Sequence, residues 1–479
     1  MAAKTTTLNA KNLEALGAPR LAELLIEIST GSAANKRRLR MELAGNHSGA
    51  EIAREVRKRF ASITRSRTVI NWRKVKAVTA DLETQRKTIV DVLAPDDPKE
   101  ALELAWHLLA LAEPIFQRSA NESSSIIESF HQACVDAGVI AKSARVEKDA
   151  LADKIFAALQ NNDHGQYDPL IAAMAPALGK DGLEQLKALF VQWSKEPEDK
   201  VAQGDRRVIG WGSQGPIYED QVYGSHRELT VRIALQEIAD AQGDVDAYIA
   251  QQPEKSRKMP LVATDIARRL LSAGRAAEAL ETLDAVDTRS RVDAPIEWQL
   301  ARVEVLEALG RADEAQADRW KWFEQSLNDV HLRAFIRRLP DFDDMEAEEK
   351  AFAFAQALPE VHRALAFFLR WPALAEAAKL VLKRKAELDG DLYELMTPAA
   401  ETLAEKHPLA ATIILRSMID FTLENARSSR YKHAARHLVR CASLAPHIED
   451  FAGVDSHDAY VAGLKSRHGN KRGFWSLVP

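Results

Sequence analysis

Three glycines, Gly210, Gly212 and Gly215, have the Gly-x-Gly-x-x-Gly spacing of a dinucleotide-binding loop. In such a loop the glycines let the backbone approach a pyrophosphate, which binds at the N-terminus of a helix that follows a buried strand. Here only 208–209 could form a strand before the glycines, and 216–220 does not resemble the first turn of an amphipathic helix. We therefore do not expect a nucleotide site at this loop.

The segment 195–225 that contains these glycines is the least helical part of the sequence, with five glycines and two prolines. Glycines allow positive φ angles, and we expect the nearby aromatic side chains to hold the connector against helices. Long ordered loops between helical blocks are uncommon and often functional. The candidate contact loop consists of Trp211, Gly212, Gly215 and Tyr218.

His433, His437 and Cys441 recur at every fourth position, which aligns them along one side of a predicted helix and makes them candidate zinc ligands. A helical wheel places Cys441 at the edge of a core face that includes Ala442, and places the histidines progressively nearer to solvent. Since the sequence offers no fourth ligand nearby, we expect boundary packing with exposed histidines and neither a metal site nor a cofactor.

Residues 36–76 form a basic segment with thirteen Lys and Arg residues against three acids. This segment has a net charge of +10 within a chain of net charge −5, so the remainder carries −15. Cations interleaved with aromatic residues are typical of nucleic-acid surfaces, whereas apolar residues such as Ile52, Val56 and Val69 also predict amphipathic helices with a solvated charged face. The candidate polyanion surface consists of Arg37, Arg38, Arg57, Lys58, Arg65, Arg67, Arg73 and Lys74.

The C-terminal segment 456–479 combines a helix, capped by Ser456 and ended by Gly469, with an aromatic pair that follows two cations. The pair, Phe474 and Trp475, is expected to dock on the last helix pair of the protein. Exposed aromatic residues also mark interfaces, so a partner-binding peptide is the alternative interpretation of this tail.

Apolar residues recur with a period of 3.6 along the whole chain, which predicts an all-α protein. No convincing alternating strand is present. A chain of 479 residues exceeds the size of one compact core, so several domains or an elongated repeat array are expected. Asp97 and Pro408 are expected to start helices, Gly138 to end one, and Pro114 to break one.

A repeat is visible in the middle of the chain, where Gly243, Gly274 and Gly310 lie 31 and 36 residues apart and each precedes a predicted helix. This spacing is close to the 34 residues of a tetratricopeptide helix pair. A weaker copy of the pattern places Ser429–Arg430 where the other turns have Gly-Arg. Helix pairs of this length must be covered by their neighbours, so we expect a tetratricopeptide-like or HEAT-like solenoid. The expected domains are an irregular N-terminal helical domain (1–194), the Gly-rich connector (195–225), a helical-hairpin array (226–455) and the C-terminal helix and tail (456–479).

The segments 21–40, 70–78, 210–220, 403–441 and 457–478 together resemble a family of uncharacterised helical proteins found largely in proteobacteria. This resemblance implies a bacterial cytosolic protein and no particular activity. The tail also resembles, more faintly, the helical ends of SWIM zinc-finger proteins, although the chain lacks the cysteine pairs of that finger. Two distant cysteines, and the lack of a signal peptide or membrane-spanning stretch, likewise favour the cytoplasm and exclude a membrane role.

Three functional hypotheses follow from these patterns. The first is a scaffold or adaptor that binds a protein partner in the groove of a helical array. The second is a nucleic-acid-associated protein that uses the basic N-terminal helices. The third and weakest is an enzyme with a site near the connector, because no nucleophile elbow, P-loop or HExxH motif is present.

Overall fold

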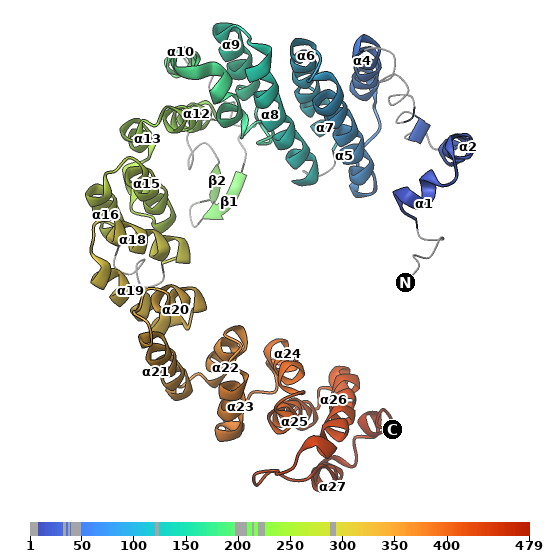
Figure 1. Cartoon of the computed structure of the whole chain (residues 1–479), viewed down its shortest axis with the longest axis vertical. Coiled ribbons are helices and arrows are strands. Elements are labelled where there is room, and N and C mark those ends of the chain that lie inside the picture. The colour runs from blue at the N-terminus through green and yellow to red at the C-terminus, as the bar shows by residue number, and fades with distance from the viewer. Residues whose placement is uncertain are drawn as a thin grey trace. The chain divides into compact units, whose positions relative to one another are not determined.

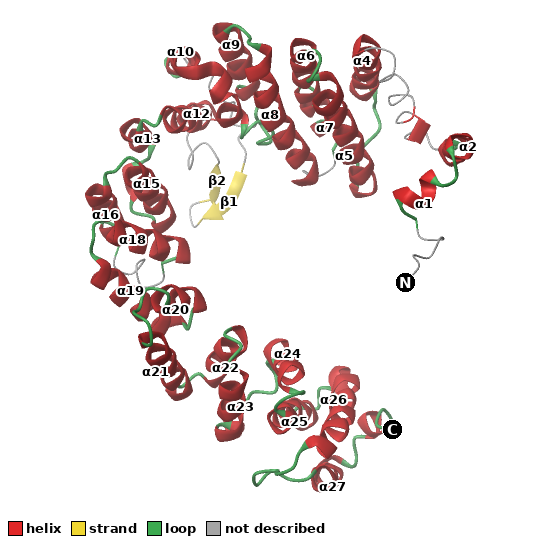
Figure 2. Ribbon diagram, viewed as in Figure 1, coloured by secondary structure: helices red, strands yellow, loops and turns green. Residues whose placement is uncertain are grey.

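A computed structural model shows a chain composed almost entirely of α-helices (Figure 1). Two short strands are the only strands in the part of the chain that the structure describes (Figure 2). None of the described helices is long and apolar enough to cross a membrane. The described residues are 8–31, 35–36, 39, 49–119, 124–196, 208–212, 215–218, 226–287 and 294–479.

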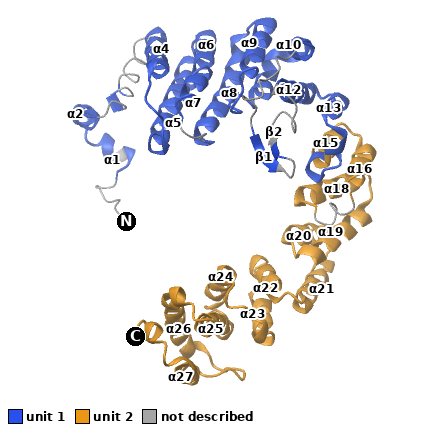
Figure 3. Ribbon diagram, turned by 180° about the vertical axis from the view of Figure 1, so that it is seen from behind, with its two compact units in different colours: residues 1–262 blue, residues 263–479 orange. Residues whose placement is uncertain are grey.

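The chain divides into two compact units, Met1–Val262 and Ala263–Pro479, with the division inside helix α15 (Figure 3). Helix α12, which follows the Gly-rich connector, packs on α10, which precedes it, so the first unit continues beyond residue 225. The elements of the first unit are α1 (Ala10–Glu14), α2 (Ala18–Ser29), α4 (Gly49–Arg65), α5 (Trp72–Lys87), the π-helix η1 (Thr88–Leu93), α6 (Pro98–Leu109), α7 (Ala112–Phe116), α8 (Ser124–Ala144), α9 (Lys148–Leu159), α10 (Leu170–Trp193), β1 (Val208–Gly212), β2 (Gly215–Tyr218), α12 (His226–Gln242), α13 (Val245–Gln251), α14 (Glu254–Arg257) and the start of α15 (Pro260–Ser272).

Helix α8 lies at the centre of the first unit, where it packs against α5, α6 and α10. Gly138 lies in the middle of α8 rather than at its end, so the predicted helix stop at this residue is wrong. A Cβ at Gly138 would lie 2.1 Å from the carbonyl oxygen of Ala173 on α10. The glycine is therefore required by the close approach of two helices and not by a turn.

Two other helix boundaries of this unit follow the sequence signals. The Asp97 carboxylate accepts a hydrogen bond from the Glu100 amide at the start of α6, and Pro98 occupies the first helical turn, where its missing amide hydrogen costs nothing. The predicted break near Pro114 is confirmed, because α6 ends at Leu109 and the short α7 begins at Ala112.

The Gly-rich connector contains an antiparallel β-hairpin, which corrects the expectation of a connector without strands. Strand β1 pairs with β2 so that Gly212 lies opposite Gly215 and Val208 lies opposite Tyr218. The φ angle of Gly215 is 117°, a value that side chains disfavour. Within the described residues the hairpin belongs to no larger sheet. The glycines therefore form a hairpin and not the strand-to-helix turn of a dinucleotide site.

The second unit consists of helices that mostly pack on the next one or two along the chain. Many of its buried apolar residues form one cluster, which extends from Phe323 to Phe474. The elements are the rest of α15, α16 (Ala276–Asp284), α18 (Ile296–Ala308), α19 (Ala312–Ser326), α20 (Asp329–Ile336), α21 (Asp343–Ala357), α22 (Val361–Arg370), α23 (Leu374–Lys383), the 3₁₀ turn η2 (Lys385–Glu387), α24 (Tyr393–Leu403), α25 (Pro408–Glu424), η3 (Ser428–Arg430), α26 (Tyr431–Leu444), η4 (Ala445–His447), α27 (His457–His468) and α28 (Arg472–Trp475).

The three turn glycines identified from the sequence all have positive φ angles, of 70° at Gly243, 75° at Gly274 and 72° at Gly310. In each turn the amide of the residue after the glycine donates to the carbonyl oxygen five residues earlier, as Arg275 N does to Leu270 O at 2.8 Å. The same bond closes the turn after α25, from Arg427 N to Thr422 O, with Ala426 at φ 49° in the place of glycine. Ala426–Arg427, and not Ser429–Arg430, is thus the counterpart of the Gly-Arg pairs.

The contact at Gly138 gives a test of the α8 packing. The substitution Gly138→Ala should destabilise the first unit by about 1–3 kcal/mol or more, because the added methyl group overlaps a backbone carbonyl that cannot rotate away. Ser143→Ala, at an exposed position of the same helix, is the matched control and should change stability by about 0.5 kcal/mol or less. Urea unfolding followed by circular dichroism measures both, and equal stability of the two variants would contradict the packing.

Candidate functional site

The described part of the basic segment comprises mainly α4, the loop 66–71 and the first residues of α5. Ile52, Val56, Phe60 and Ile63 recur along α4 at helical spacing and are all buried. Because these residues occupy one face of the helix, the cations between them point to the opposite, solvated face. The residues 66–71 form no helix, and Val69 is 59% exposed, so Val69 does not belong to the apolar face expected from the sequence.

Most cations of α4 are paired with carboxylates, which the sequence did not reveal. Arg57 bonds Glu100 of α6, and this hydrogen bond raises the pKa of the guanidinium. Lys58 contacts Glu55 at 2.6 Å. Arg59 bonds Asp81 of α5, with Nε donating to the carboxylate at 2.8 Å. The positive charge of Arg57 and Lys58 is thus locally compensated, so we remove both from the candidate polyanion surface. Arg37 and Arg38 lie outside the described residues.

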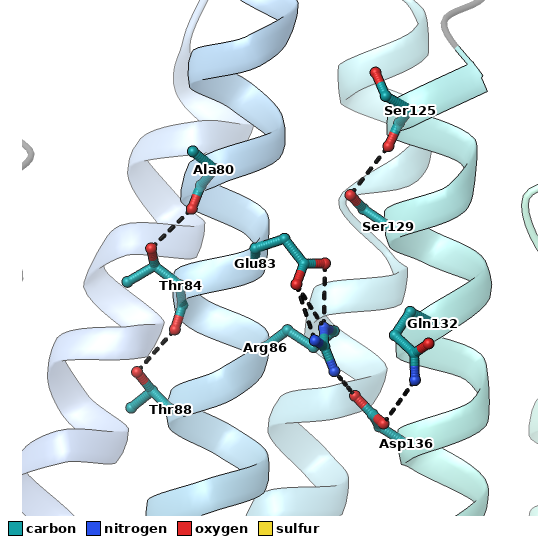
Figure 4. A network of polar contacts seen from close by, with 9 residues as sticks. All are labelled: Ala80, Glu83, Thr84, Arg86, Thr88, Ser125, Ser129, Gln132 and Asp136. Carbon is teal, nitrogen blue, oxygen red and sulfur yellow. Dashed lines mark hydrogen bonds and ion pairs between the residues drawn. The ribbon is translucent and has the colours of Figure 1, made fainter. Parts of the chain in front are cut away.

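Arg86 of α5 shows the same compensation between helices. Figure 4 shows its guanidinium between Glu83, one turn earlier on α5, and Asp136 on α8. The side chains of Arg86 and Asp136 are each 15% exposed, and Gln132 donates a further hydrogen bond to Asp136 at 3.2 Å. The hydrogen bond to Glu83 contributes most to raising the pKa of Arg86. These side chains join α5 to α8 and are not available to a ligand.

Five cations at the junction of α4 and α5 remain uncompensated, and we call this group the basic corner. Each is exposed, and in the described part of the chain none forms an ion pair. Two of them make only backbone contacts: Arg65 Nε donates to Ala61 O at 3.0 Å and Lys74 Nζ to Val69 O at 3.4 Å. The basic corner consists of Arg65, Arg67, Arg73, Lys74 and Lys76.

An aromatic ring lies within the basic corner. The Trp72 side chain is 78% exposed, and the Arg73 guanidinium lies 4.9 Å from the centroid of its ring. The loop before it is fixed by Ile70, which is 4% exposed and whose amide donates to Arg118 O at 2.8 Å. The buried Ile70 thus holds the end of the loop in place, and the exposed indole ring of Trp72 begins α5 beside Arg73.

A cavity of about 510 Å³ adjoins the basic corner. Its walls come from Asn35, α4, the loop 66–71, α5, α7 and the residue Arg118 after it, and they include Lys74 of the basic corner. Arg118, after α7, also lines it, with Nε donating to Pro114 O at 2.7 Å and Nη2 to Ile63 O at 3.2 Å. Burial lowers the pKa of Arg118. Arg118 could not be found from the sequence, because a single arginine after a broken helix gives no periodic or motif signal.

Of the two aromatic residues in the predicted contact loop, only the side chain of Trp211 lies within the described part of the structure. Trp211 is 79% exposed on the hairpin, and Gly212 ends the strand that pairs with the strand beginning at Gly215. Tyr218 pairs with Val208 through its backbone. The exposed indole shows that the expected packing of Trp211 is wrong.

His433, His437 and Cys441 follow the predicted gradient along α26, since His433 is exposed, His437 half-buried and Cys441 fully buried. Burial lowers the pKa of His437 to about 4 and raises that of Cys441 to about 12. In the described residues no group of His, Cys, Asp or Glu has the arrangement of a metal site. Ala442 is exposed, in contrast to its predicted place in the core.

The aromatic tail ends the second unit. Phe474 is fully buried and contacts Tyr431 edge to face, with 6.0 Å between the ring centroids. Trp475 is partly buried, and its Nε1 donates to His468 O at 2.9 Å. Phe474 is therefore a core residue of this unit and does not present a free side chain to a partner.

By its fold the chain is an all-helical protein of helices packed on their sequence neighbours, with one short β-hairpin in its described part. It belongs to the family of unknown function DUF6880, which it matches over residues 3–477. The comparison with curated proteins gave no match.

The contrast between buried and exposed ion pairs gives a second test. Arg86→Gln should destabilise the first unit by about 3 kcal/mol, because two partly buried carboxylates lose their cation. Arg54→Gln, whose exposed pair with Glu51 spans 3.6 Å, should change stability by less than about 1 kcal/mol. Chemical unfolding of both variants measures the difference, and a loss for Arg54→Gln as large as that for Arg86→Gln would contradict this assignment.

Proposed function

We propose that this protein binds single-stranded nucleic acid through the basic corner. The observation that carries the proposal is that five exposed cations, none of them in an ion pair within the described residues, lie between residues 65 and 76, in the same stretch as the exposed Trp72 ring that Arg73 contacts. Neighbouring cations such as Arg57, Arg59 and Arg86 are paired with carboxylates. Uncompensated cations gain most from an arriving phosphate chain, because binding releases condensed counterions without breaking a protein ion pair.

The exposed ring favours single strands over duplexes. Bases of a single strand can stack on an aromatic side chain, and such stacking contributes about 1–3 kcal/mol per base with little sequence preference. In a duplex the bases are already stacked and paired, so the Trp72 ring has no free base to contact. The arrangement of Trp72 between Arg67 and Arg73 in the sequence therefore suits a strand whose phosphates contact the cations while a base covers the indole.

Protein binding is a second candidate function, and the repeated helix turns support it. The same backbone bond closes the turns at Gly243, Gly274, Gly310 and Ala426, as expected for tetratricopeptide-like hairpins. In this second proposal the hairpins form a solenoid, and the protein acts as a cytoplasmic scaffold or adaptor. It rests on analogy with other repeat proteins, whereas the nucleic-acid proposal rests on particular side chains.

Salt dependence tests the nucleic-acid proposal. Five phosphate contacts predict that log K for a single-stranded oligonucleotide falls with log salt with a slope of about −3.5, so affinity drops about 100-fold between 50 and 200 mM salt. Changing Arg65, Arg67 and Arg73 to Gln should reduce this slope by about 2. Fluorescence anisotropy with a labelled oligonucleotide measures both effects.

The matched control removes the same charge elsewhere. Lys406, Lys432 and Arg440 are exposed residues of the second unit, and their triple change to Gln should leave the slope and the affinity within about twofold of the original. If both triple variants weaken binding equally, the charge acts nonspecifically and the basic corner is not the site. Lack of binding at 50 mM salt would overturn the proposal itself.

The aromatic contribution is tested separately. Trp72→Ala should weaken single-strand binding about 10-fold, because one base loses its stacking partner, while Trp72→Phe should retain most of the affinity. Duplex binding should not change. Competition anisotropy with single-stranded and double-stranded competitors gives this comparison, and equal losses for Ala and Phe would exclude stacking.

A further inference from the structure

We propose that the cavity beside the basic corner binds a phosphomonoester of nucleotide size. This inference rests on the proposed function, since Lys74 belongs to both the cavity wall and the basic corner. The basic corner is proposed to contact any phosphate chain, whereas the cavity is proposed to bind one particular group, a terminal phosphate.

The charges on the cavity wall do not balance. Lys74, Arg59 and Arg118 are cationic, whereas Asp81 is the single carboxylate on the described wall and is already bonded to Arg59. Lys74 and Arg118 thus remain without a carboxylate partner in the described part of the chain. Two uncompensated positive charges match a phosphomonoester, which carries a charge of about −1.5 to −2 at neutral pH.

Hydrogen bonds of the Arg118 side chain orient its guanidinium for binding a phosphate. Its Nε and Nη2 donate to the carbonyl oxygens of Pro114 and Ile63, so the guanidinium is fixed in place. Within the described residues Nη1 has no acceptor. Burial disfavours the charged guanidinium, which is why the pKa of Arg118 is lowered. An anion bound in the cavity would act as its counterion and offset this desolvation free energy.

The remainder of the wall suits the organic part of a nucleotide. Ala77, Val78 and Ala80 contribute accessible apolar surface, and Ser66 and Thr68 contribute hydroxyl groups. The volume of about 510 Å³ lies within the usual range of small-molecule sites. A phosphate at the cationic wall would leave a base and sugar against the apolar wall.

The phosphomonoester could come from the 5′ end of a nucleic-acid strand or from a free mononucleotide. Both present the same dianion to Lys74 and Arg118. A strand end would in addition continue across the basic corner and contact residues such as Arg73. The two sources therefore predict different affinities for the same phosphate.

Isothermal titration of the full chain with uridine 5′-monophosphate, uridine and inorganic phosphate tests the cavity. We expect the monophosphate to bind at least 10-fold more tightly than uridine or phosphate alone. Arg118→Gln should lower the affinity for the monophosphate at least 10-fold, while Arg54→Gln, paired with Glu51 on α4, should leave it within twofold. Equal binding of uridine and its monophosphate would overturn the inference, as would an unchanged affinity of Arg118→Gln.

A second variant tests the cavity independently, in case Arg118→Gln does not fold. Ala77 is exposed on α5 and lines the cavity, so Ala77→Glu places a negative charge at the wall without disturbing the core. It should reduce monophosphate binding at least 10-fold, with an unchanged circular dichroism melting curve. Retained affinity in a folded Ala77→Glu variant would overturn the inference independently of Arg118.

Two hexanucleotides, one with a 5′-phosphate and one with a 5′-hydroxyl, distinguish the sources. Binding of the phosphorylated strand that is tighter than that of both the 5′-hydroxyl strand and uridine monophosphate assigns the cavity to a strand end, whereas equal binding of the two strands together with binding of the monophosphate assigns it to a free nucleotide. If the 5′-hydroxyl strand binds with the salt dependence of the basic corner while the monophosphate does not bind, the cavity inference fails and the proposed function stands. Binding of the monophosphate without binding of either strand supports the cavity site and overturns the proposed function.

Discussion

Most of the described helices bury an apolar face against helices close to them in the sequence, and the rest of the described structure depends on that packing. In the first unit one continuous apolar cluster extends from Ile52 on α4 to Ile238 on α12. A particularly close contact occurs where Gly138 of α8 meets the backbone of α10. Because α4, α5 and α7 are fixed by close packing, the loop 66–71 between α4 and α5 has a defined position.

The basic corner is a consequence of this packing. Burial of Ile63 and Ile70 fixes both ends of the loop between α4 and α5, so the cations within and after this loop face solvent. Carboxylates on α5, α6 and α8 compensate the cations that face them, as Asp81, Glu100 and Asp136 do. The cations beyond their reach keep an uncompensated charge. The candidate site is thus defined as much by where acidic residues are placed as by the basic residues themselves.

Local signals in the sequence predicted local structure well. The periodicity predicted the all-α class, and Gly243, Gly274 and Gly310 marked turns, because a positive φ angle is a property of a few neighbouring residues. Contacts between distant residues had no such signal. The pairing of Arg57 with Glu100 joins residues 43 positions apart, and the requirement for Gly138 arises from α10. Arg118 and Lys74 line the same cavity because of how α7 packs. The hairpin was missed because its glycines resemble those of a loop.

The proposed contact between a nucleic-acid strand and the Trp72 ring can be located directly. The measurement is photocrosslinking with an oligonucleotide that carries 5-iodouracil, followed by mass spectrometry of the digested protein. We predict that the main crosslinked peptide contains Trp72 and that high salt suppresses the crosslink. Crosslinks that map instead to Trp211 on the hairpin, or to the second unit, would contradict the proposed function.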